Sequence, residues 1–157
     1  MLNVLIIEDD EEKARKLEEF IHGEYLESKV SCEKSFSTGL RALIAGANDF
    51  DIVLLDMSMP SYDISPQEPS GGTPVAFAGK ELLAQMRLRS IDVPTIVVTM
   101  FDSFTEGAKR ASLDQLVGEL KADLSPPFKG YVYYNAAQEG WIASLKKLID
   151  ENIRRQA

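Results

Sequence analysis

The sequence predicts an α/β fold in which a parallel sheet carries helices on both faces. Two observations predict it. Short, continuous apolar runs are typical of strands buried on both faces, and apolar stripes at helical spacing stand between them. The two patterns alternate five times along 157 residues, which favours a parallel sheet with crossover helices. Because that length is ordinary for one core, we expect one domain over residues 1–157.

The individual elements follow from the same two patterns. Alternation with polar neighbours favours an edge strand with one inward face around Val30 and Cys32, and Cys32 is interpreted as a small apolar residue there. The other strands are expected at Leu2–Ile7, Phe50–Leu55, Thr95–Thr99 and in the stretch FKGYVYY. The helical stripes are Ala14, Leu17, Phe20 and Ile21; Phe36, Leu40, Leu43 and Ile44; Leu82, Leu83 and Met86; Leu113, Leu116, Val117, Leu120 and Leu124; and Trp141, Ile142, Leu145, Leu148, Ile149 and Ile153.

Two stretches are longer than a minimal β-α unit needs. Residues 61–78 carry three prolines and two adjacent glycines, which predicts a long loop after the third strand. Such a loop is either functional, overhanging a pocket or meeting a partner, or a disordered insertion. Residues 102–128 are interpreted as an extended helical crossover, with capping boxes at Ser103–Glu106 and Ser112–Gln115.

The charge and the cysteine content exclude several classes of function. A formal net charge of −8 disfavours binding to nucleic acid or to anionic membrane surfaces. A single cysteine cannot form an internal disulfide, and neither a signal peptide nor a spanning segment is recognisable. We therefore expect a cytoplasmic protein.

Acidic residues follow two of the predicted buried strands. Glu8 and Asp9 end the first strand and Asp56 ends the third, while the fourth ends in Thr99. Ligands of open parallel sheets bind beyond the carboxyl ends of the strands, and clustered carboxylates suit a hard cation, Mg²⁺ best. The alternative is that the acids after the first strand only complement a helix N-terminus, which does not explain Asp56.

The segments VLIIEDD, FDIVLLDMSMP, GKELLAQMR and VPTIVVT together resemble the receiver domain of two-component response regulators. The resemblance implies a flavodoxin-like fold with strand order 2-1-3-4-5 and, here, long insertions after strands 3 and 4. It implies these roles: Glu8 and Asp9 as the acidic pair for Mg²⁺, Asp56 as phosphoacceptor and metal ligand, the backbone carbonyl of Ser58 as a further ligand, Thr99 as switch hydroxyl and Tyr131 as switch aromatic residue.

The sequence departs from the receiver pattern at the end of the fifth strand. Tyr134 stands where the family has a lysine, Asn135 stands where it has a proline, and Met100 follows the switch hydroxyl in place of a small residue. The missing ammonium predicts slow modification of Asp56 unless another cation, such as Lys80 or Lys109, reaches the site.

The resemblance implies a non-enzymatic, stand-alone and atypical receiver, because no output domain follows Ala157. A sensor histidine kinase or a phosphotransfer protein would supply the phosphoryl group, an unidentified downstream protein would receive the signal, and a homodimer stays open. One alternative is a pseudo-receiver that binds partners without phosphorylation. Another is a Mg²⁺-dependent phosphohydrolase, which is weaker because Ser58 replaces the second carboxylate of its DxD pair.

Overall fold

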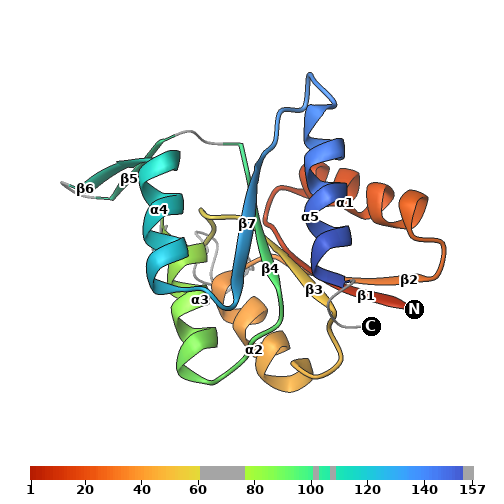
Figure 1. Ribbon diagram of the computed structural model, residues 1–157, viewed down its shortest axis with the longest axis horizontal. Helices are drawn as coiled ribbons and strands as arrows, with labels where there is room; N and C mark the ends of the chain where they lie inside the picture. Colours follow the sequence, from red (N-terminus) through yellow and green to blue (C-terminus); the bar gives the residue numbers. More distant parts are fainter. Residues whose placement is uncertain (61–76, 101–102, 107–108, 154–157) are drawn as a thin grey trace, which may run out of the picture.

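A five-stranded parallel sheet forms the centre of the molecule (Figure 1). The computed structural model describes residues 1–60, 77–100, 103–106 and 109–153. The strand order β2-β1-β3-β4-β7 is the expected 2-1-3-4-5 order. The sheet strands are β1 (Leu2–Ile7), β2 (Ser28–Glu33), β3 (Ile52–Leu55), β4 (Thr95–Thr99) and β7 (Phe128–Tyr133).

Helices cover both faces of this sheet, as the β-α alternation predicts (Figure 1). On one face, α1 and α5 pack against β1, β3, β4 and β7 through Leu17, Ile21, Leu145 and Ile149. On the other face lie α2, α3 and α4. The helices are α1 (Glu11–Glu24), α2 (Phe36–Gly46), α3 (Ala78–Leu88), α4 (Leu113–Asp123) and α5 (Gly140–Ile153).

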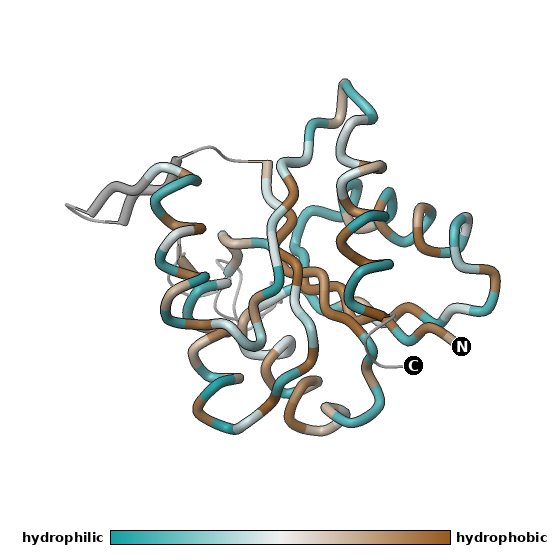
Figure 2. The backbone as a smooth tube through the Cα atoms, in the orientation of Figure 1, coloured by the Kyte–Doolittle hydropathy of each residue, from teal (hydrophilic) through white to brown (hydrophobic). Residues whose placement is uncertain are grey.

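The central strands are buried on both faces, which explains their continuous apolar composition. Every residue of β3 and β4 is buried, and side chains of each strand alternate between the two core clusters. Figure 2 shows the resulting hydrophobic stretches along the middle of the sheet. This rigid centre fixes the positions of the residues that follow β1 and β3.

Helix-capping signals place several boundaries. The capping box of Ser112 and Gln115 is confirmed at the start of α4. The side chain of Asp10 accepts a hydrogen bond from the backbone N–H of Lys13 and caps α1. Helix α3 begins at Ala78, so the expected loop ends just before it, and residues 61–76 of that loop lie outside the described residues.

The structure corrects the expected helical crossover over residues 102–128. Its first part is an antiparallel hairpin of β5 (Ser103–Glu106) and β6 (Lys109–Ser112), so the capping box expected at Ser103–Glu106 is wrong. Only two residues, Gly107 and Ala108, separate these strands in the sequence, and glycine in the first position of a two-residue connection is a common hairpin signal.

Two smaller expectations about burial are also wrong. Cys32 is exposed on β2, which is an edge strand of the sheet. Ile44 is 54% exposed on α2, whereas Leu43 beside it is fully buried. Within the described ranges, no helix has the length and apolar character required to cross a membrane.

Candidate functional site

Three carboxylates meet at the carboxyl edge of the sheet. Strands β1 and β3 are parallel neighbours, with Ile7 opposite Leu55, so the residues that follow them lie side by side. Carboxylate oxygens of Glu8, Asp9 and Asp56 all lie within 4.8 Å of one another. Glu8 and Asp56 are 2% and 3% exposed, and Asp9 is exposed. The sequence prediction that these carboxylates converge is therefore met in the structure.

The electrostatics of this cluster favour the binding of a cation. The pKa of Glu8 is raised to about 8, chiefly because the carboxyl group is buried; the Lys13 ammonium opposes this rise and the negative charge of Asp56 adds to it. Burial and Asp56 also raise the pKa of Asp9. The raised pKa values mean that the charged forms of these acids are disfavoured in this cluster, which a bound cation would relieve, and an all-oxygen set of this kind suits Mg²⁺.

A buried lysine lies against the same carboxylates. The side chain of Lys13 is 1% exposed, and its Nζ atom lies 2.5 Å from Oε1 of Glu8 and 3.4 Å from Oδ1 of Asp56. The same ammonium donates a hydrogen bond to the carbonyl oxygen of Val98 at 2.6 Å. The site therefore contains a fixed positive charge in addition to its three acids.

The two oxygens of the Asp56 carboxylate have different environments. The backbone N–H of Met57 donates to Oδ1 at 2.8 Å, and Lys13 approaches this same oxygen. Within the part of the chain that the structure describes, no hydrogen bond or ion pair engages Oδ2 of Asp56. One oxygen is therefore oriented by the protein, and the other is available for a ligand or for chemistry.

The remaining predicted residues lie on β4, on or directly after β7, and shortly after β3. Thr99 is buried at the end of β4, and its carbonyl oxygen accepts a hydrogen bond from the backbone N–H of Tyr134 at 2.8 Å. Tyr134 is 4% exposed, and its ring centroid lies 5.8 Å from Nζ of Lys13. Tyr131 lies elsewhere: it packs half-buried on the α4 side of the sheet. Ser58 is half-buried two residues after Asp56.

Comparisons with known proteins agree with this architecture. No protein-family model matches the chain. The Detocs response regulatory protein DtcB of Enterobacter cloacae is 33% identical over 150 residues, which cover 96% of this chain and 99% of that protein. The chain belongs to the response regulator receiver family. The uncharacterized protein y4jR of Sinorhizobium fredii is 29% identical to this receiver over 147 residues, with 92% and 95% of the two chains covered.

Solved structures of receiver domains have the same fold as this receiver. A response regulator receiver domain from Clostridium thermocellum superposes with a TM-score of 0.66 at 18% identity, covering 99% of this chain and 97% of its own. The receiver domain of the Francisella response regulator 1452 gives a TM-score of 0.61 at 19% identity, with both chains fully covered. At these identities, the likeness concerns the fold alone.

The cation beside Asp56 in this receiver is Lys13, which we did not expect from the sequence. Lys80 instead pairs with Glu119 of α4, with 2.8 Å between Nζ and Oε2, and the side chain of Lys109 lies outside the described residues. Lys13 was missed because a lysine in the first turn of a helix is normally at the surface. The available signal was its spacing, four residues before Leu17 and seven before Phe20 on the buried stripe of α1.

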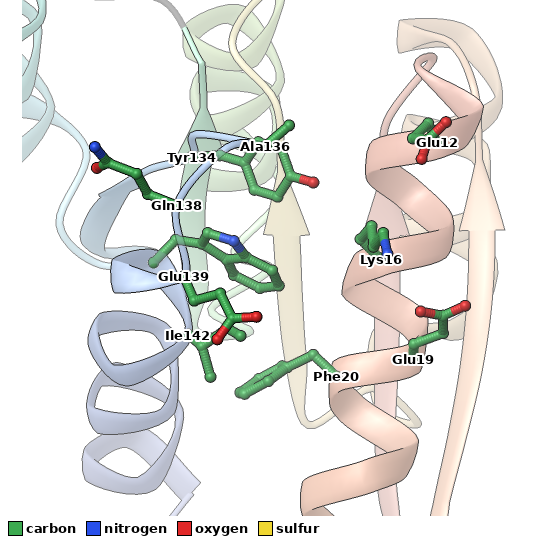
Figure 3. Close-up of a pocket in the computed structure, with 10 residues that line it drawn as sticks. Glu12, Lys16, Glu19, Phe20, Tyr134, Ala136, Gln138, Glu139 and Ile142 are labelled. Carbon is green, nitrogen blue, oxygen red and sulfur yellow. The ribbon is translucent and has the colours of Figure 1, made fainter.

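A cleft of about 380 Å³ lies beside the site, between α1 and α5. Tyr134 lines it together with Phe20 and Trp141, and the ring centroids of Tyr134 and Trp141 are 5.0 Å apart. Figure 3 shows Phe20 reaching from α1 toward Ile142 of α5, with Lys16 on the α1 side. Tyr134 thus contacts the cleft on one side and approaches Lys13 on the other.

Proposed function

We propose that this receiver accepts a phosphoryl group on Asp56 and signals through a phosphorylation-dependent contact with another protein. The observation that carries this proposal is the environment of Asp56. Its carboxylate is buried at the switch point of the sheet, Oδ1 is held by the N–H of Met57, and two further carboxylates lie within 4.8 Å. Such a nucleophile is positioned for phosphoryl transfer, which depends chiefly on positioning and charge neutralisation.

The transfer itself requires one attacking oxygen. Oδ2 of Asp56 forms the new bond to phosphorus, while the bond from phosphorus to the donor breaks and the donor leaves with its electron pair. The donor is a phosphohistidine of a sensor kinase or phosphotransfer protein, or a small acyl phosphate. Membership of the response regulator family supports this class of donor.

The donor set at the site fits Mg²⁺. Glu8, Asp9 and Asp56, with the backbone carbonyl of Ser58, would hold the ion, which when bound neutralises charge on the phosphoryl oxygens. The hydroxyl of Thr99 would donate a hydrogen bond to the phosphoryl group. Tyr131 would change its position on the α4 side of the sheet when Asp56 is phosphorylated, so we assign the phosphorylation-dependent partner contact to that side.

A second function, a binding module that is never phosphorylated, is favoured by one observation. The ammonium of Lys13 already contacts Glu8 and Asp56, so the cluster is partly neutralised without any metal ion. In that case, partner binding would not depend on a phosphoryl donor.

Intact-mass spectrometry separates the two functions. The parent protein and the Asp56→Asn variant are each incubated with Mg²⁺ and acetyl phosphate. Asp92→Asn is the matched control, because Asp92 is exposed in the segment between α3 and β4. We expect one added phosphoryl group on the parent and on Asp92→Asn, and none on Asp56→Asn. Equal masses for treated and untreated parent, with either acetyl phosphate or a phosphohistidine donor, would leave the binding module.

A further inference from the structure

Lys13 is in an unfavourable position for an ammonium group. It is the third residue of α1, close to the positive end of the helix dipole, which disfavours a cation. Its side chain is nevertheless almost fully buried, which none of the other lysines and arginines with described side chains matches. A buried charge is tolerated only when its neighbours compensate for the lost hydration. The groups that contact the Lys13 ammonium are therefore the ones that stabilise its charge.

Those contacts place the ammonium at the candidate phosphorylation site. An ammonium has three N–H donors. One is donated to the carbonyl oxygen of Val98, and the ammonium also forms a short ion pair with Oε1 of Glu8. Its separation from Oδ1 of Asp56 is longer, 3.4 Å, which leaves the ammonium able to donate to an anion bound on that carboxylate.

The same ammonium lies close to the residue that ends the fifth sheet strand. The ring of Tyr134 follows β7, and its centroid is 5.8 Å from Nζ of Lys13. A cation carried by α1 and a cation carried by residue 134 would therefore reach one shared space beside Asp56. The two positions are alternatives for supplying the same charge.

We propose that Lys13 binds the phosphoryl oxygens as the phosphoryl group moves onto Asp56, so that this receiver supplies from α1 the cation that the tyrosine at position 134 lacks. The inference rests on the proposed function. The ammonium keeps all three protons throughout: the Asp56 oxygen-to-phosphorus bond forms, the donor bond breaks, and Lys13 only donates a hydrogen bond to an oxygen of the transferred group.

Initial rates of labelling by acetyl phosphate at saturating Mg²⁺ test this role. Lys13→Met removes the charge while keeping an unbranched side chain, and Lys16→Met is the matched control at an exposed position on the same helix. We expect labelling to slow at least about tenfold for Lys13→Met and to stay at the parent rate for Lys16→Met. Circular dichroism checks that each variant is folded.

Moving the charge gives a test that a structural role of Lys13 would not satisfy. Adding Tyr134→Lys to Lys13→Met should raise the labelling rate at least about tenfold above that of Lys13→Met alone. In the parent, Tyr134→Lys should raise the labelling rate less than about threefold, because the two ammonium groups compete for one space. The Tyr134→Lys variant alone keeps the test decisive even if Lys13→Met does not fold.

The outcomes separate this inference from the function on which it rests. A folded Lys13→Met protein that is labelled at the parent rate overturns the role of Lys13 alone, and so does a gain of tenfold or more for Tyr134→Lys in the parent. A parent that carries no label on Asp56 overturns the proposed function and this inference with it.

Discussion

Replacing Gly79 with alanine should disturb the segment that carries the phosphoacceptor candidate. Gly79 is the second residue of α3, and its backbone N–H donates to the carbonyl oxygen of Met57 at 2.8 Å. A Cβ atom at this position would lie 2.6 Å from the carbonyl oxygen of Asp56 and 2.9 Å from Cα of Met57. Both contacts are with backbone, so neither can be relieved by a rotamer change.

The magnitude follows from two opposing effects. Overpacking of this kind costs about 1–3 kcal/mol, while alanine in a helix gains about 0.5–1 kcal/mol over glycine. We expect Gly79→Ala to lower the free energy of unfolding by up to about 2.5 kcal/mol and to slow labelling of Asp56, because α3 must move away from the turn after β3.

Gly118→Ala is the matched control for this substitution. Gly118 lies in α4, is exposed, and a Cβ atom there would meet nothing within 4 Å. It should raise the free energy of unfolding by about 0.5–1 kcal/mol without changing the labelling rate. Urea denaturation and acetyl phosphate labelling measure the two quantities. If Gly79→Ala proves as stable as Gly118→Ala and is labelled as fast as the parent, the close approach of α3 to Asp56 has been misjudged.

Two further predictions concern ionisation and the contact between α1 and α5. Because the pKa of Glu8 is raised to about 8, protons compete with metal below that pH, so Mg²⁺ affinity by calorimetry should rise between about pH 6 and about pH 9. Glu8→Gln should weaken binding and flatten this rise, and an unchanged slope would exclude Glu8 as the titrating group. The hydroxyl of Tyr25 donates to Oδ1 of Asp150 at 2.7 Å, so Tyr25→Phe should lower the free energy of unfolding by about 1 kcal/mol. Tyr133→Phe, at a 47% exposed position, should change it by less than about 0.5 kcal/mol, and equal effects of the two substitutions would show that the hydrogen bond contributes nothing.

The sheet and the main helices could be predicted because their signals are local and repeated. The central strands carry continuous apolar runs that a doubly covered sheet must bury, as the fully buried Ile52–Leu55 shows. The convergence of Glu8 and Asp56 follows from the same physics, since neighbouring parallel strands bring their carboxyl ends together.

The hairpin of β5 and β6 was missed because its signal was ambiguous. Ser103 and Glu106 fit the spacing of a capping box, and the helical stripe that starts at Leu113 favoured extending a helix upstream. The glycine at position 107 was the competing signal. Strand pairing depends on the partner segment, and the weak preferences of one short segment do not reveal it.

Lys13 was missed for a different reason. Residue type favours a surface position for lysine, while its spacing on the stripe of α1 favours a buried one. Its burial is decided by tertiary neighbours that are remote in sequence, above all Asp56 and Val98. A polar residue on an otherwise apolar helical face is therefore a signal to test against nearby acidic clusters.

The most direct test of the central claim is to identify the residue that receives the phosphoryl group. After incubation with Mg²⁺ and acetyl phosphate, borohydride reduces an aspartyl phosphate to homoserine, and peptide mass spectrometry locates the reduced residue. We predict homoserine at position 56 only, dependent on Mg²⁺ and lost when Asp9→Asn removes a metal ligand. Reduction at another aspartate, or none in a folded protein treated with either small-molecule or phosphohistidine donors, would contradict the assignment of Asp56 as phosphoacceptor.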